Sequence, residues 1–277
     1  MPPESLPPGD PADDATAFEL VDMTTAWNQA PADPSTNSSA APRATRWSCT
    51  RVLTGHSSWV RSVAVSADGN FIVSGSGDKT VRVWNLATGH TIQVIDSHRA
   101  WVRAVAVSPD RTCFASVSND NIIQLWDFTT GQSIGQLDGH SNWVRAVAFG
   151  PSGKYLFSGG QDNTVCVWRL SDSEADRCAK PALVHQFEGH THWVRSLAVS
   201  HDGTTLISGS QDQTIRLTRL KGRGTNRVLT GHTSEVLAVA ASPNNWLLAS
   251  ASADCTVRFW KLNSGRETTC FKAHPAP

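Results

Sequence analysis

The alternation of hydrophobic and polar residues between positions 60 and 95 is typical of short β-strands separated by turns. In residues 60–65 the apolar side chains alternate with small or polar ones, and one step of three residues predicts a β-bulge. Three further strands are expected at 71–74, 81–84 and 91–95, each bounded by a turn that contains Gly or Asp. Four short strands in succession predict an all-β unit.

This unit recurs at a nearly constant interval. Histidines stand at positions 56, 98, 140, 190, 232 and 274, so successive intervals are 42, 42, 50, 42 and 42 residues. Each of the first five is followed by Ser after 18 residues and Asp after 22, and all but the fourth by Trp after 28. The sets are His56, Ser74, Asp78 and Trp84; His98, Ser116, Asp120 and Trp126; His140, Ser158, Asp162 and Trp168; His190, Ser208, Asp212 and Thr218; and His232, Ser250, Asp254 and Trp260. Four strands per period of about 42 residues indicate one propeller blade.

The pattern of Gly, His, Ser, Asp and Trp, copied five times over residues 46–274, resembles the WD40 repeat, although the Trp-Asp dipeptide itself occurs only at 126–127. The resemblance implies an all-β WD40 β-propeller with five four-stranded blades, from repeats that begin near 53, 95, 137, 187 and 229. In that family each blade borrows its outer strand from the next sequence repeat. The four-residue sets are implied to be structural tetrads, linked by hydrogen bonds within each blade.

A Ser, His and Asp together also suggest a hydrolase, but five identical copies around a ring favour a structural role over five active sites. One His and one Asp per blade are too few for a metal site, so neither a metal nor another cofactor is expected. The fourth repeat has Thr218 where the others have Trp. We therefore expect the fourth blade to be the least stable.

The sequence pattern does not decide whether the five blades close into a ring. Residues 51–54 are expected to form an outer strand that precedes the first blade, and residues 266–272 the outer strand of the fifth. This is one strand too many for five blades. The alternatives are a tight five-bladed ring with a spare strand, or an incomplete part of a larger ring whose unpaired edges would favour self-association.

The charges divide the chain into two parts. Residues 1–42 contain seven acidic residues, eight prolines and no Lys or Arg, and the remaining residues carry 24 basic and 24 − 7 = 17 acidic side chains. We expect a disordered, acidic, Pro/Ser/Ala-rich tail over 1–45 and the propeller over 46–277. There is no apolar run long enough to span a membrane, and the six cysteines form no C-x-x-C pair, so we expect a cytoplasmic or nuclear protein with no membrane partner.

The chain has eleven Trp against one Tyr and two Met, which the tetrads explain only in part. Positions 3 and 5 after each tetrad His read Trp and Arg in four repeats. These predicted partner-binding residues are Trp59 and Arg61, Trp101 and Arg103, Trp143 and Arg145, Trp193 and Arg195, and Glu235 and Leu237. In WD40 propellers these positions lie on the top face beside the central channel, where partners bind. The alternative is that they are inherited by duplication or pack between blades.

Arginine beside tryptophan suits cation–π stacking and the capture of carboxylate or phosphate groups. The sequence therefore predicts a non-enzymatic protein-interaction scaffold whose top face favours acidic or phosphorylated segments. The alternative is a propeller that binds RNA or DNA through the same residues. The extra eight residues of the third interval lie near 171–180 and are expected to form a solvated loop on the opposite, bottom face.

Overall fold

The computed structural model describes residues 49–96, 98–170, 181–221 and 226–273, and these form five four-stranded antiparallel sheets. In blade 1, β1 (Val60–Val65), β2 (Phe71–Ser76), β3 (Thr80–Asn85) and β4 (Thr91–Asp96) lie in sequence order. The other blades are β5 (Val102–Val107), β6 (Cys113–Ser118), β7 (Ile123–Asp127) and β8 (Ser133–Leu137); β9 (Val144–Phe149), β10 (Tyr155–Gly160), β11 (Val165–Arg169) and β12 (Ala182–Phe187); β13 (Val194–Val199), β14 (Thr205–Ser210), β15 (Ile215–Arg219) and β16 (Arg227–Leu229); and β17 (Val236–Ala241), β18 (Leu247–Ser252), β19 (Thr256–Lys261) and β20 (Glu267–Lys272). The predicted all-β fold with five four-stranded blades is confirmed.

The local features follow the sequence pattern. The pairing of β1 with β2 shifts register between Val60 and Ser62, where the spacing predicts a bulge, and the inner strand of every other blade shifts at the same place. In the turn after β2, Lys79 has a φ of 72°, and the corresponding turns of the other blades also contain one residue with positive φ. The same turn therefore closes the second hairpin of each blade.

The hydrophobic core lies between the blades. The inner strands β1, β5, β9, β13 and β17 contact one another in this order. One buried cluster joins Val73 and Val81 of blade 1 to Val102 and Val105 of blade 2, and equivalent clusters lie between the later blades. We call each blade-to-blade contact a seam. The four seams hold the five blades side by side.

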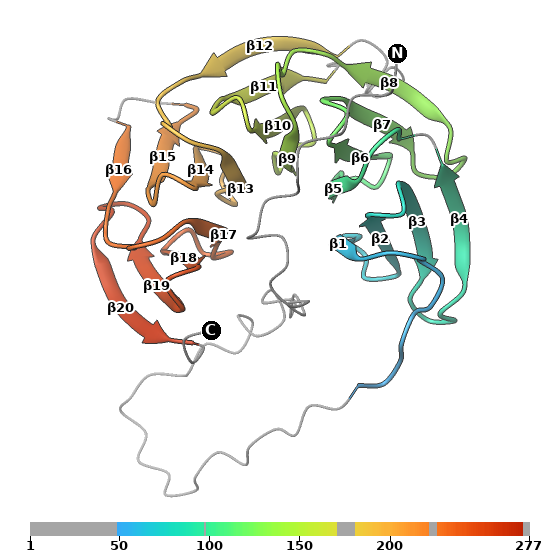
Figure 1. Cartoon of the computed structure of the whole chain (residues 1–277), viewed down its shortest axis with the longest axis horizontal. Coiled ribbons are helices and arrows are strands. Elements are labelled where there is room, and N and C mark those ends of the chain that lie inside the picture. The colour runs from blue at the N-terminus through green and yellow to red at the C-terminus, as the bar shows by residue number, and fades with distance from the viewer. Residues whose placement is uncertain (1–48, 97, 171–180, 222–225, 274–277) are drawn as a thin grey trace, which may run out of the picture.

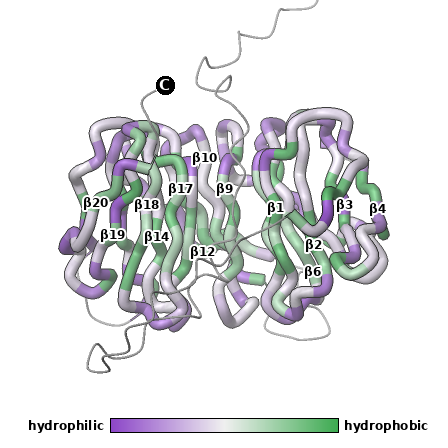
Figure 2. The backbone as a smooth tube through the Cα atoms, turned by 90° about the horizontal axis from the view of Figure 1, so that it is seen from below, coloured by the Kyte–Doolittle hydropathy of each residue, from purple (hydrophilic) through white to green (hydrophobic). Residues whose placement is uncertain are grey.

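The blades form an open arc (Figure 1), with blade 5 at one end and blade 1 at the other. Figure 2 looks into the opening, and β9 of blade 3 is seen between the two ends. The five described blades therefore do not close into a tight ring, as the first alternative would require. Hydrophobic stretches follow the strands, whereas the loops at both edges of the arc are more hydrophilic.

The prediction of an outer strand over residues 51–54 is wrong, because the structure assigns no strand to these residues. The segment still lies beside blade 1, where the Arg51 guanidinium donates to the carbonyls of Leu86 and Ala87. A strand needs a partner edge, and the outer edge of β19 is occupied by β20. The other predicted outer strand, over 266–272, is confirmed by β20. The predicted tail over 1–45 and loop near 171–180 lie outside the described residues.

Candidate functional site

The structure brings the members of each tetrad together. His Nδ1 lies 2.8–3.1 Å from the Asp carboxylate and His Nε2 lies 2.7–2.8 Å from the Ser hydroxyl in all five blades. The indole N–H donates to the Ser oxygen at 2.8–2.9 Å in blades 1, 2, 3 and 5. The carboxylate also accepts the backbone N–H of the residue after the His. Each tetrad thus ties the loop before the inner strand to the second strand of its blade, and in blades 1, 2, 3 and 5 the indole extends this link to the third strand.

The electrostatics of the tetrads favour charged carboxylates. Burial raises the pKa of Asp162, but hydrogen bonds from His140 and Thr164 outweigh it and hold the pKa below its usual value. The other four tetrad aspartates are shifted in the same direction. Burial of His140 lowers its pKa, yet the interactions with Asp162 and Cys166 outweigh this and raise the pKa to about 9. The third tetrad is therefore stabilised as an ion pair.

The fourth tetrad lacks its indole, and a pocket lies in its place. This pocket of about 150 Å³ is lined by Thr218 together with His190, Ser208 and Arg216. Thr218 pairs with Leu206 in the same register in which Trp84 pairs with Ile72. Thr218 therefore occupies the same position in its strand as the tetrad Trp does in the other blades.

The predicted partner-binding residues of blades 1–4 form one continuous row, which we call the Trp–Arg row: Trp59, Arg61, Trp101, Arg103, Trp143, Arg145, Trp193 and Arg195. The Arg61 guanidinium lies 4.8 Å from the Trp59 ring centroid and 5.3 Å from that of Trp101 in the next blade. Arg103 lies 5.2 Å from Trp101 and 5.8 Å from Trp143. The row continues with Arg145, 4.6 Å from Trp193. Cation–π contacts therefore cross every seam from blade 1 to blade 4.

The indoles and guanidiniums of the row differ in exposure. Trp59 and Trp101 are 55% and 36% exposed, whereas Arg103 and Arg145 are buried. The Nε of Arg103 donates to the Asn119 side-chain oxygen at 2.7 Å. These two arginines thus contribute to the seams, as the packing alternative expects, and the indoles offer the larger surface to a partner.

In blade 5 a carboxylate, that of Glu235, stands at the position of the row tryptophans. Glu235 forms an ion pair of 2.6 Å with Arg195, and both side chains are nearly buried. Leu237 stands where the other blades have Arg, and it is partly exposed. The positive character of the row therefore decreases toward this end.

The partners of the row arginines are a part of the site that the sequence pattern did not single out. With its side-chain oxygen turned toward Arg145, Gln161 accepts from that Nε at 3.0 Å, just as Asn119 accepts from Arg103. Both amides stand immediately before the tetrad Asp of their repeat. An amide recurring at that position was the signal available in the sequence.

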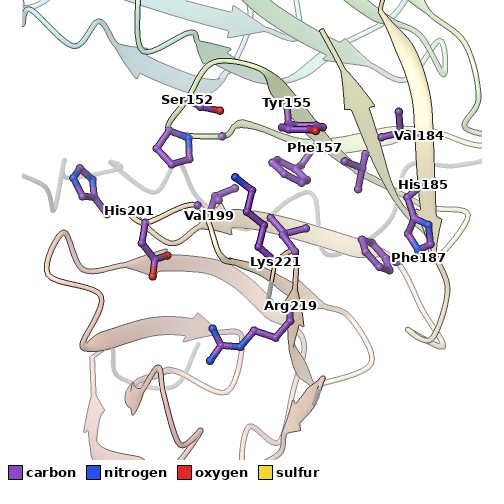
Figure 3. A pocket seen from close by; sticks show the side chains of 16 residues that line it. Ser152, Tyr155, Phe157, Val184, His185, Phe187, Val199, His201, Arg219 and Lys221 are labelled. Atoms are coloured by element: carbon purple, nitrogen blue, oxygen red, sulfur yellow. The ribbon is translucent and has the colours of Figure 1, made fainter. Parts of the chain in front are cut away.

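A second pocket lies at the opposite end of the inner strands, in the seam between blades 3 and 4. It measures about 570 Å³ (Figure 3), and Tyr155, Phe157 and Phe187 of blade 3 lie opposite Val199 and Lys221 of blade 4. In the first seam, the corresponding space is occupied by Arg111, which stacks on Phe71 and Phe128. Blade 4 has Gly203 at the position of Arg111, so this space is left open.

The described residues offer neither a cluster of metal ligands nor a helix that could span a membrane. They contain no group of three His, Cys, Asp or Glu side chains placed to hold a metal ion. No helix among them is long and apolar enough to cross a membrane.

The comparisons with known proteins agree with this geometry. The family model "WD domain, G-beta repeat" matches residues 47–85, 89–127, 131–169, 181–218 and 224–261. Among similar relatives, the pre-mRNA-splicing factor prp46 of Emericella nidulans is 51% identical over 43 residues, which are 16% of this chain and 10% of that protein. A ribosome biogenesis protein BOP1 homolog of Drosophila grimshawi is 54% identical over 44 residues, 16% of this chain and 6% of its own. These alignments span about one repeat and a small part of each relative, whereas the family model covers most of this chain. The five matches, the five blades and their tetrads show that the chain belongs to the WD40-repeat family.

Proposed function

We propose that this WD40 arc is a non-enzymatic protein-interaction scaffold that binds its partner through the Trp–Arg row. The observation that carries the proposal is the set of cation–π contacts between indole and guanidinium groups, one of which crosses each seam from blade 1 to blade 4. Trp and Arg are the residue types most enriched where protein interfaces hold most of their binding energy. The exposed rings of Trp59 and Trp101 supply a rigid apolar surface at the first seam.

A non-enzymatic role agrees with the state of the tetrads. A nucleophilic serine must reach a substrate, but the five tetrad serines are at most 3% exposed. In four blades the serine oxygen already accepts a hydrogen bond from the indole. The Ser–His–Asp sets are therefore interpreted as blade supports.

The partner that we propose is a protein segment with acidic or phosphorylated side chains. Four arginines line the row, and Arg195 forms an ion pair with Glu235. Because Arg103 and Arg145 also bind amide oxygens, we expect the indole faces to supply the contact area and the arginines to select the sign of charge.

The alternative is a nucleic-acid backbone bound to the same row. It is favoured by the printed names of two relatives, a splicing factor and a ribosome biogenesis protein, although each alignment covers about one repeat. The cytoplasmic or nuclear location is part of the proposal, and these names favour the nucleus.

The test measures fluorescence anisotropy of a labelled acidic peptide, a phosphorylated version, a basic peptide and a single-stranded RNA, each with the full chain. We expect the acidic and phosphorylated peptides to bind, and the double variant Trp59→Ala/Trp101→Ala to weaken them at least about tenfold, the usual effect of removing an interface hot spot. The matched control is Trp246→Ala. Trp246 is 75% exposed but lies in a turn at the opposite end of the inner strand.

Two results would contradict the proposal. Equal losses in the Trp59→Ala/Trp101→Ala and Trp246→Ala variants would show that the row is not the contact surface. Tighter binding of RNA than of any peptide, with a steep dependence on salt, would favour the nucleic-acid alternative.

A further inference from the structure

The inner strand of blade 1 exposes apolar residues whose counterparts in the other blades are buried or partly buried. Val60 is 51% exposed, whereas its counterparts Val102, Val144, Val194 and Val236 are 0% exposed. Val63 and Val65 of the same strand are also exposed. In the other blades this surface is covered by the preceding blade. We call the surface formed by Val60, Val63 and Val65 the head face.

Blade 5 has the complementary exposed surface, which we call the tail face: Val257, Phe259 and Phe271. Phe271 is 54% exposed, and Val257 and Phe259 are partly exposed. Their counterparts in the first four blades are Val81, Val83 and Ile95; Ile123, Leu125 and Leu137; Val165, Val167 and Phe187; and Ile215, Leu217 and Leu229. All of these are buried except Phe187, which is partly buried, and they pack in the seams.

The two end faces are the two halves of a contact that the chain already makes four times. A Cβ added to Gly75, Gly159 or Gly209 would lie within about 3 Å of the next blade's inner-strand valine, so the seam is tight at this position. The tail face has Ala251 here, and blade 2 shows that a side chain fits, because Val117 is fully buried in the second seam. The tail face can therefore accept a head face in the geometry of an ordinary seam.

The Trp–Arg row also supports the pairing of a head face with a tail face. Within the chain, the Arg of one blade stacks on the Trp of the next, as Arg61 does on Trp101. In blade 5, Leu237 takes the position of that Arg. In blade 1, Trp59 has no preceding blade to supply an arginine to its ring. A seam between these faces would place Leu237 against Trp59, an apolar pair in place of a cation–π pair.

We propose that the occupant of the tail face is the head face of a second copy of this chain, so that the arcs associate head to tail. This interface joins two different surfaces, so each added copy leaves one free head and one free tail, and association continues with concentration. The interface includes Trp59 of the Trp–Arg row, but it is tested by self-association and not by peptide binding.

The new seam requires residues 51–54 of the incoming copy to change position. Residues 51–54 of the incoming copy would fall where β20 already pairs with β19. The 51–54 segment forms no strand and Val52 is 74% exposed, so this segment is the one expected to move aside.

The experiment is sedimentation velocity of the full chain over a range of concentrations, with the variants Val63→Asp on the head face and Phe271→Asp on the tail face. A carboxylate buried in an apolar seam is strongly unfavourable, so each variant alone should remain a monomer where the wild type is half associated. The matched control is Val94→Asp. Val94 is 53% exposed on the outer strand β4, and its counterpart in blade 4, Val228, stays 49% exposed beside a complete seam, so this variant should associate like the wild type.

The decisive sample is an equimolar mixture of the two end-face variants. The Val63→Asp chain keeps an intact tail and the Phe271→Asp chain an intact head, so the mixture should form a dimer and stop there. Circular dichroism melting of each variant alone identifies a chain that fails to fold, in which case Val60→Asp or Phe259→Asp replaces it. A monomeric wild type at all concentrations, or a mixture that remains monomeric, would overturn the proposal. The latter result would indicate closure of one chain on itself or a different partner.

Discussion

The pocket in blade 4 offers a sharp test of the tetrads, because the substitution Thr218→Trp should refill it. A cavity of about 150 Å³ can hold a benzene-sized ring. The pocket beside Thr218 has about that volume and is lined partly by polar side chains such as Ser208 and Arg216. The restored indole N–H would face Ser208, whose counterparts accept such a bond at 2.8–2.9 Å. The substitution should therefore stabilise the protein.

The magnitude follows from area and hydrogen bonding. A buried Trp removes about 150–250 Å² from water, and if about 100 Å² of this is gained over Thr, the gain is about 2.5 kcal/mol. The hydrogen bond to Ser208 adds about 1 kcal/mol. Imperfect fit in the pocket opposes these gains by about 1–2 kcal/mol. We expect a net increase of about 2 kcal/mol in the free energy of unfolding, or about 4–8 °C in melting temperature.

The assay is thermal unfolding of the wild type, Thr218→Trp and two reference variants. Thr218→Phe provides a ring without the N–H and should gain less than Thr218→Trp. Trp168→Thr recreates the blade 4 situation in blade 3 and should lose about 3–5 kcal/mol. A lower melting temperature for both Thr218 variants would refute the reasoning, because it would show that the pocket has repacked around a smaller residue.

Three further predictions concern the tetrads. Asp162→Ala removes the carboxylate that faces His140, and we expect a loss of about 2–4 kcal/mol, measured by urea unfolding; an unchanged midpoint would contradict the structural role. The pKa of Asp162 is lowered in the folded state, so the stabilisation by its carboxylate is present above about pH 3.8 and is lost as the pH falls toward the folded pKa. The pKa of His140 is raised to about 9, so the stabilisation by its imidazolium is present below about pH 6.5 and is lost as the pH rises through 9. Melting temperature against pH should therefore fall on both sides for the wild type, and Asp162→Asn should flatten both limbs. In hydrogen exchange, β14 and β15 should open before β2 and β3, because blade 4 lacks its indole; equal protection would count against this.

Much of the fold could be predicted from the sequence because each repeat signals the same local structure. The His, Ser, Asp and Trp positions recur in phase, and the spacing of Val60 and Val63 marks the bulge. The same logic failed at residues 51–54, because strand formation depends on a free partner edge and not on the segment alone.

The sequence pattern indicates where the Trp–Arg row lies in each repeat, but not the contacts that its side chains make. The Trp-Val-Arg pattern places Arg103 near the top of its strand, but it does not tell whether the guanidinium faces solvent or the next blade. The structure places it in the seam against Asn119. The pocket between blades 3 and 4 could not be foreseen either, because it depends on a glycine at position 203 and on side chains from two repeats meeting in space.

The most direct test of the central claim, that the Trp–Arg row is the partner-binding surface, is hydroxyl-radical footprinting of the full wild-type chain with and without the acidic peptide. Indole rings are readily oxidised, and Trp59, Trp101 and Trp246 are all exposed in the free protein. The account predicts that the peptide protects Trp59 and Trp101 and leaves the oxidation of Trp246 unchanged. Protection of Trp246, with Trp59 and Trp101 still reactive in the complex, would contradict it.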